Sequence, residues 1–355
     1  MKLRTNKSDL LRAIKCMTFP KSTLLLEVDK DVVLTSTDGT VVIKSQVEAE
    51  VIRPGTSCVS GPIFHDILTK IRGDVVGLEI KDGKMMVTGE RSRVAVALLD
   101  AEAFPFQVEE PEEWIFTIDT QVMREAIKKT AHAIKSDKVP MPLRGLYMEA
   151  EGGNLSFMGC DTKQFALYQC ELPSEEKFNC IIPREHIKLI ENMLEGKEIS
   201  FALTNYFAVF GTETHILYTR TVNAAYPPAR KIIEKQRICQ GEIDSGELIR
   251  AIELATITAD ATNTKGVKEI HITARNDGIE VGAKNELGTA SDIISAEMTG
   301  EEVRVAYDAT NLINALKAVG KHTVQVGFSG REEPMIIHGQ GCDFAVVAVR
   351  SREVS

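Results

Sequence analysis

The feature that most constrains this chain is an internal repeat that recurs three times with a period of a little over 120 residues. A turn between two strand-like runs is centred on Asp38, and matching turns follow at Asp161 and Asn285, spaced by 123 and 124 residues. A helix-like segment follows each turn at a similar offset, and a long last strand closes each copy. Solenoid repeats are about 20–50 residues long, so a repeat of this length is a domain. The sequence therefore predicts three copies of one domain.

Within each copy the order is helix, strands, helix, strands, which predicts an α+β fold. Apolar residues at helical spacing predict six helices, over 7–17, 62–72, 119–138, 184–197, 245–256 and 308–321. Two proline-containing stretches, 104–114 and 226–237, lie where copies meet and are predicted to be extended linkers. The predicted domains are residues 1–114, 115–237 and 238–355.

Composition places the chain among ordinary globular proteins. Of its 355 residues 43% are apolar and 26% charged, which excludes disorder. No apolar run approaches the roughly 20 residues of a membrane helix, and charges interrupt any signal-peptide core in the first 15 residues. The seven cysteines are widely spaced without a CxxC pair, so we expect reduced thiols, no disulfide framework and no zinc site. We expect a cytoplasmic protein that makes no membrane contact.

The sequence carries no signature of catalysis. The seven histidines are scattered, and there is no HExxH, no GxxxxGK[ST], no GxGxxG between a strand and a helix, and no GxSxG. Asp38 and Asp161 recur like catalytic carboxylates, but an aspartate at such a turn more often bonds the local backbone. A hydrolase whose carboxylates are assembled only by the fold stays as the less favoured alternative.

Charge is segregated along the chain. The six helical segments carry a net charge of +5, so the remainder carries −14 of the total −9. Arg124, Lys128 and Lys135 fall within about 40° of each other on a helical wheel, beside an apolar stripe. Basic helices in an otherwise acidic chain favour contact with phosphates from one surface.

Several stretches of this sequence resemble the bacterial DNA sliding clamp family, the β subunit of DNA polymerase III. The most specific are GERSRVAVALLDAEAFP at 89–105, CDTKQFAL at 160–167, IIPREHIKLIENMLEG at 181–196, YTRTVNAAYPPARKII at 218–233, NLINALKAV at 311–319 and FAVVAVR at 344–350. The resemblance implies three clamp-type (processivity-fold) domains per chain, with helices inside and antiparallel sheets outside, and a six-domain ring formed by a head-to-tail homodimer. It also implies a non-catalytic, cofactor-free and metal-free protein that encircles double-stranded DNA of any sequence and tethers the polymerase.

Residue roles follow from the resemblance by position. The implied DNA-facing cations are Lys21, Arg124, Lys128, Lys135, Arg184, Lys188, Lys317 and Lys321. The implied dimer contacts are Arg91, Arg93, Val94 and Val96 on one side and Thr256 and Ile257 on the other, with Glu286 or Asp292 nearby. Polymerase and clamp-loader subunits would dock short linear peptides in a pocket formed by Leu143, Cys160, Thr162, Lys163, Gln164, Phe165, Pro227, Lys231, Ile232, Ala345, Val347, Val349 and Arg350.

The chain departs from the family pattern in three places. The first copy is about ten residues shorter between its first helix and the turn at Asp38. Thr162-Lys163-Gln164 replaces the family's common Gly-His-Arg, and valines replace methionines near the end of the chain. We expect a divergent clamp with a shifted partner preference. The open alternative within the same fold is a paralogue that docks proteins without encircling DNA.

Overall fold

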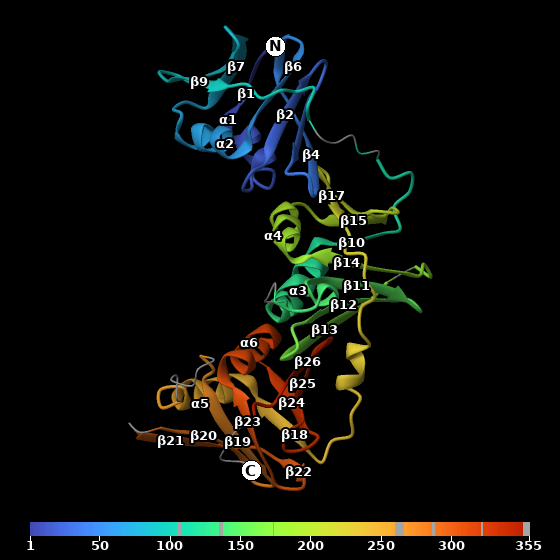
Figure 1. The fold of residues 1–355 in the computed structure, drawn as a ribbon, viewed down its shortest axis with the longest axis vertical. Helices are drawn as coiled ribbons and strands as arrows, with labels where there is room; N and C mark the ends of the chain where they lie inside the picture. Colours follow the sequence, from blue (N-terminus) through green and yellow to red (C-terminus); the bar gives the residue numbers. More distant parts are fainter. Residues whose placement is uncertain are drawn as a thin grey trace. The chain divides into compact units, whose positions relative to one another are not determined.

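The computed structural model describes residues 1–104, 108, 110–134, 138–172, 174–259, 266–285, 288–320 and 322–350. The three copies share one element order: a strand, a helix, four or five strands, a second helix and three strands (Figure 1). The first copy comprises β1 (Lys2–Asn6), α1 (Lys7–Ile14), β2 (Thr23–Val28), β3 (Val32–Thr37), β4 (Val41–Val47), β5 (Glu50–Arg53), β6 (Gly55–Ser60), α2 (Gly61–Lys70), β7 (Val75–Lys81), β8 (Lys84–Thr88) and β9 (Arg93–Ala97).

The other two copies repeat this order with small changes. The second comprises β10 (Phe116–Asp119), α3 (Thr120–Thr130), short turns η1 (Ala131–Ala133) and η2 (Met141–Leu143), β11 (Gly145–Glu151), β12 (Asn154–Cys160), β13 (Gln164–Glu171), β14 (Phe178–Pro183), α4 (Arg184–Met193), β15 (Glu198–Leu203), β16 (Phe207–Gly211) and β17 (His215–Arg220). The third, after η3 (Ala229–Ile232), comprises β18 (Cys239–Asp244), α5 (Ser245–Ala255), β19 (Glu269–Arg275), β20 (Gly278–Asn285), β21 (Gly288–Ser295), β22 (Met298–Gly300), β23 (Val303–Asp308), α6 (Ala309–Val319), β24 (Thr323–Phe328), β25 (Met335–Gly339) and β26 (Cys342–Val346).

All six predicted helices are present, and local chemistry explains where several begin. Asp244 and Asp308 each accept a backbone N–H of the first helical turn, from Glu247 (2.8 Å) and Thr310 (3.0 Å). The predicted helix over 119–138 is too long, because α3 ends at Thr130. The hydroxyl of Thr130 bonds back to the carbonyl of Ala126 (2.6 Å), and the chain then turns to bury Ala133 and Ile134.

The chain packs as two compact units, Met1–Arg124 with Glu185–Thr221, and Glu125–Arg184 with Val222–Ser355. Each unit contains one large antiparallel sheet that joins two copies. In the first unit β17 pairs with β4, with Leu217 opposite Ile43; we call this pairing the first seam. In the second unit β26 pairs with β13, with Phe344 opposite Ala166; this is the second seam. Each seam therefore joins the last strand of one copy to the fourth strand of the copy before it.

β9 and β21 correspond by position in their copies to the strands that pair at the seams, but they lie at sheet edges. The last strand of the first copy, β9, ends the five-stranded sheet β5-β1-β7-β8-β9. The fourth strand of the third copy, β21, ends the four-stranded sheet β21-β20-β19-β23. Within the described part of the chain, neither strand has a partner on its outer side. The two kinds of strand that pair at the seams are therefore each represented once more, by β9 and β21, at a free sheet edge.

The cysteine side chains are largely buried. All seven cysteines are free thiols, five buried and two half-buried, and burial raises the pKa of Cys16 to about 12. None of the helices in the described ranges has the length and apolarity needed to cross a bilayer.

Candidate nucleic-acid and partner interfaces

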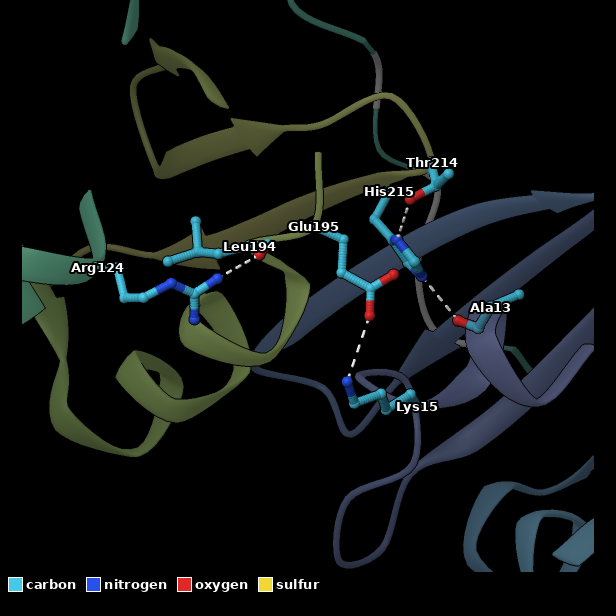
Figure 2. A network of polar contacts seen from close by, with 7 residues as sticks. All are labelled: Ala13, Lys15, Arg124, Leu194, Glu195, Thr214 and His215. Carbon is cyan, nitrogen blue, oxygen red and sulfur yellow. Dashed lines mark hydrogen bonds and ion pairs between the residues drawn. The ribbon is translucent and has the colours of Figure 1, made fainter. Parts of the chain in front are cut away.

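Polar contacts tie the first seam together (Figure 2). His215 lies on β17 with 3% of its surface exposed, and its Nε2–H donates to the carbonyl of Ala13 at the end of α1 (2.8 Å). In the neutral ring Nδ1 accepts from the hydroxyl of Thr214 (2.7 Å). Lys15, two residues further along the chain, pairs with Glu195 (3.3 Å). The C-terminal end of α1 is therefore fixed to the second copy.

A second buried histidine lies at the other end of the same seam. Thr40 donates its hydroxyl to Asp38 (2.7 Å) and so accepts from Nε2–H of His186 (3.2 Å), while Nδ1 of that ring contacts the hydroxyl of Thr219 (2.6 Å). Burial lowers the pKa of both His186 and His215 below the ordinary value, although Glu185, Asp38 and Glu195 act in the opposite direction. Both rings are therefore neutral at pH 7.

Acid is expected to destabilise the first unit through these two rings. Because their pKa is lower in the folded than in the unfolded chain, the unfolded chain takes up protons first. Their contribution is complete above about pH 6.5, the unfolded value, and declines as the pH falls below it. Urea unfolding at pH 7.5 and 5.5 should show a larger loss for the parent than for His186→Gln/His215→Gln. An equal loss in both proteins would exclude the histidines as its source.

The recurring turn residues bond the backbone and form no acidic cluster. Asp161 accepts from the N–H groups of Lys163 and Gln164 (both 3.0 Å), Asp38 accepts from Thr40 (2.9 Å), and Asn285 accepts from Gly288 (3.0 Å). The described residues include no group of three or more histidine, cysteine, aspartate or glutamate side chains placed to hold a metal ion. These turns therefore have a structural role, which matches the preferred interpretation of the sequence.

Thr162 holds a strained backbone conformation in the second of these turns. Its φ is +71°, a left-handed value that is unfavourable for a β-branched residue, and Gly39 takes the equivalent place in the first copy with φ +97°. Thr162→Gly is expected to raise the free energy of unfolding by about 0.5–1 kcal/mol, the difference between relieved strain and added freedom in the unfolded chain.

Gly39→Thr is the matched reverse change. No atom lies within 4 Å of a Cβ placed at Gly39, so only backbone strain opposes the threonine. Urea unfolding should show this variant less stable than the parent. If both substitutions shift stability in the same direction, strain at this turn is not the cause.

The predicted DNA-facing cations are mostly exposed, but several have local partners. Lys188 pairs with Glu191 (2.7 Å), and Lys317 with Glu253 (3.2 Å). Arg124 donates to the carbonyl of Leu194 (2.6 Å) beyond the end of α4 (Figure 2). Lys21, Lys128 and Arg184 are exposed, and Lys21 lies in the turn before β2 with φ +66°.

Two of the predicted cations, Lys135 and Lys321, lie outside the described residues. Because α3 ends at Thr130, the helical-wheel argument that grouped Lys135 with Arg124 and Lys128 is wrong. Sequence reasoning passed over exposed cations at two other predicted helices, namely Arg12 and Lys15 on or just after α1 and Arg250 on α5. A wheel drawn for every predicted helix would have found them.

The predicted partner pocket lies on the outer face of the second seam. Phe165 and Ala345 face each other across this seam and form an apolar cluster with Met158, Leu167 and Ile336. Tyr226, Ala229, Ile232 and Ile233 of the second linker pack against this cluster while only partly buried. The backbone N–H of Val347 bonds to the carbonyl of Lys163 (2.8 Å), so the last residues follow the cluster.

The predicted pocket residues divide into a buried floor and an accessible rim. Leu143, Gln164, Phe165 and Ala345 are buried. Gln164 faces the helices rather than the outer cluster, and donates to the carbonyl of His132 and to Asp161 (both 3.0 Å). The remaining predicted residues are half-buried or exposed: Cys160, Thr162, Lys163, Pro227, Lys231, Ile232, Val347, Val349 and Arg350.

The second linker is fixed beside this cluster. The rings of Tyr147 and Tyr226 are stacked with centroids 4.3 Å apart, and Arg230 pairs with Glu149 (3.1 Å). These contacts were not predicted from sequence. The signal in the sequence was the NAAYPP stretch, which contains Tyr226. They hold Ile232 against the apolar cluster.

The first seam has the same register but a different outer face. The residues equivalent to Phe165, Ala345 and Val347 are Val42, Tyr218 and Arg220. Tyr218 is 1% exposed. Its ring occupies the position that the much smaller side chain of Ala345 occupies in the second seam. Size and polarity therefore distinguish the two seams, and the second offers the more apolar surface.

The predicted dimer residues lie at the two free edges. Arg93, Val94 and Val96 are on β9, and Arg91 precedes that strand. Thr256 and Ile257 follow α5, and the Ile257 side chain is 77% exposed. Glu286 lies outside the described residues, and Asp292 is on β21.

Three related domains joined by shared sheets define a clamp-type chain, and comparison with known proteins agrees. Family models for the N-terminal, central and C-terminal domains of the DNA polymerase III beta subunit match residues 19–108, 117–228 and 230–349. The beta sliding clamp of Staphylococcus aureus is 24% identical over 96% of this chain and 94% of its own length. That of Bacillus subtilis (strain 168) is 21% identical over 87% of this chain and 85% of its own length.

A solved structure shows the same fold. The Pseudomonas aeruginosa sliding clamp bound to griselimycin superposes with a TM-score of 0.90 at 21% identity, covering 99% of this chain and 100% of that one. The chain belongs to the DNA polymerase III beta subunit family, the bacterial sliding clamps. Members of this family are processivity factors without catalytic activity of their own.

Proposed function

We propose that two copies of this chain close head to tail into a ring that encircles duplex DNA and tethers the replicative polymerase. The observation that carries the proposal is the repeated seam. A last strand pairs with a fourth strand twice within the chain, and one strand of each kind, β9 and β21, lies at a free edge of the described sheets. A third contact of the same kind between copies uses both edges, and two such contacts close a dimer.

We take the register of this proposed contact between copies from the internal seams. Val94 corresponds to Leu217, because it pairs with Val87 in its hairpin as Leu217 pairs with Phe210. On the other edge Ala290 corresponds to Ile43, which faces Leu217 in the first seam. The proposed ladder therefore sets Val94 opposite Ala290 and Arg93 opposite Ser291.

Charge and shape support this register. Ser291 bonds to Glu280 on the next strand (2.8 Å), so Arg93 would reach a carboxylate across the contact. Ile257 follows α5, at the position where the equivalent end of α1 packs into the first seam. A hollow of about 350 Å³ beside β9 and α2, lined in part by Ile63, Ile67 and Val94, would receive it.

We further propose that exposed cations on or near the two helices of each copy contact the DNA backbone without reading bases. Diffuse phosphate contacts give salt-sensitive binding and allow movement along any sequence, whereas base-edge contacts would hold the ring in place. The proposed domains are residues 1–114, 115–237 and 238–355, and the proposed location is the cytoplasm.

A topological test separates this function from others. The protein loaded onto nicked circular plasmid should stay bound through gel filtration and be released when a restriction enzyme linearises the plasmid. Binding to short linear duplexes should be weak, should weaken further with salt and should not depend on base sequence. Loading requires the cognate clamp loader, and a reaction without the loader is the control.

The competing functions predict different outcomes. A paralogue that only docks proteins would elute free of circular and linear DNA alike. Equal retention on both forms, or a strong preference for one base sequence, would contradict encirclement.

We also propose that the second seam binds short linear peptides from polymerase and clamp-loader subunits. An apolar floor with a polar rim suits a short chain with apolar anchors. The griselimycin complex of the P. aeruginosa clamp supports ligand binding by a protein of this fold.

A further inference from the structure

We infer that the second seam prefers peptides whose apolar anchors are flanked by acidic residues. This inference rests on the proposed peptide-binding function and adds the charge of the partner. It comes from three rim cations, Lys163, Lys231 and Arg350, which we call the cation rim. Each of them is exposed.

Two of the three rim cations lie within two residues of members of the apolar cluster along the chain, and the third follows shortly after Val347. The carbonyl of Lys163 accepts the N–H of Val347, so Lys163 lies beside the last residues of the described chain (2.8 Å). Lys231 is next to Ile232, which packs on the cluster. Arg350 directly follows Val349, whose N–H bonds to the carbonyl of Ala306 on β23 (2.8 Å). A peptide lying on the cluster would therefore meet Lys163 and Lys231, and one that continues along the last residues would also meet Arg350.

The three cations of the rim have no acidic partner within the described chain. Several other cations of the same unit are paired: Arg230 with Glu149 (3.1 Å), Lys235 with Glu333 (2.5 Å), and Lys177 with Glu151. Among the described residues, no carboxylate lies within 4 Å of a side-chain nitrogen of the cation rim. In a chain with a net charge of −9, three unpaired cations around one apolar surface favour an anionic partner.

The first seam provides an internal comparison. The residues equivalent to Lys163 and Arg350 are Thr40 and Asn223, both neutral. The seam that lacks these cations is also the one whose outer face is filled by Tyr218. Apolar space and cations at these two positions therefore occur together in the second seam, which fits one ligand using both.

A peptide fits better than single-stranded nucleic acid. Strand binding by stacking requires exposed aromatic faces, but Phe165 is 1% exposed and Tyr226 is stacked against Tyr147. The accessible apolar residues, Ile232, Val347 and Val349, are aliphatic and suit leucine-like anchors.

The test compares three fluorescent ten-residue peptides that share the apolar residues of the host polymerase's C-terminal tail. Their flanking residues are changed to Asp and Glu, to Ser, or to Lys, and anisotropy measures affinity for the full-length protein. We expect the acidic peptide to bind about five- to tenfold more tightly than the neutral one at 0.1 M salt, and the lysine peptide more weakly than either. The difference should disappear in 0.5 M salt.

A rim variant and a matched control locate the effect. Lys163→Ser/Lys231→Ser/Arg350→Ser should bind acidic and neutral peptides equally, whereas Lys177→Ser/Lys235→Ser, which removes paired cations, should keep the difference. Equal binding of all three peptides to the parent, or a preference that survives in the rim variant, would overturn the charge inference and leave the pocket standing. If no peptide binds, the proposed pocket itself is wrong. If a ten-nucleotide oligo(dT) displaces the acidic peptide at equal concentration, the site is a nucleic-acid site instead.

Discussion

Ile257→Asp is expected to convert the protein from a dimer to a monomer of 39.1 kDa at micromolar concentration. The side chain is 77% exposed in the single chain, and the proposed contact would bury it beside β9 and α2 of the other copy. Burying an isoleucine contributes about 1.5–3 kcal/mol, and a carboxylate in its place would have no partner. Because a two-copy ring contains this contact twice, the loss doubles to about 3–6 kcal/mol, which weakens dimerisation by at least about 100-fold.

Tyr206→Asp is the matched control for this variant. Tyr206 is almost equally exposed, at 72%, but lies in the turn before β16, whose sheet contains neither β9 nor β21. Sedimentation velocity should show a dimer for the parent and for Tyr206→Asp. A parent protein that is already monomeric would contradict the ring, and a dimeric Ile257→Asp would contradict the proposed contact. Arg93→Glu should also weaken the dimer, and Glu280→Arg in the same chain should restore part of the loss.

Val347→Asp is expected to abolish binding of polymerase-tail peptides, with an affinity at least about 100-fold lower. Val347 is half-buried beside the apolar cluster of the second seam, where a carboxylate would be desolvated by a bound apolar anchor. Its backbone bond to Lys163 does not involve the side chain, so the fold should be kept. Removing the chain after Phe344 is a poorer test, because β26 runs to Val346 and pairs with β13.

The equivalent position in the first seam supplies the control. Arg220→Asp introduces the same carboxylate at the residue that matches Val347, on an exposed position of β17. Anisotropy with the same peptide should give the parent's affinity for this variant, and thermal unfolding should show that both variants are folded. Equal loss of binding in both would mean that the second seam is not the pocket.

The sequence was informative wherever the determining interactions are local. The helices and turns follow from apolar spacing and from Asp38, Asp161 and Asn285, and the repeat predicted the element order. The end of α3 at Thr130 was missed, because the apolar spacing continues through Ala133 and Ile134, which tertiary packing buries outside the helix.

The candidate sites were predicted less completely because they depend on contacts between distant segments. Alternation along β13 sets Gln164 and Phe165 on opposite faces, so only one of them can face the outer cluster. The partners of Arg124 and Lys317 lie 70 and 64 residues away, and no sequence spacing reveals them. The pairing of β17 with β4 could not be inferred from either strand alone, since many antiparallel partners would satisfy the same alternation.

The pairing of strands from different copies at the seams determines what happens when the chain is divided. A fragment ending in the first linker would lose β17, so β4 would become an edge at one side while β9 remained an edge at the other. Those two edges are unlike and complementary, as the seams show, and exposed edges of this kind recruit further strands. Such a fragment has two complementary ends. Copies of it can therefore join one after another without limit, unless the growing assembly bends back and closes into a ring. Joining three copies covalently removes two of the three joints from that concentration-dependent growth and leaves only one to be made and broken between molecules.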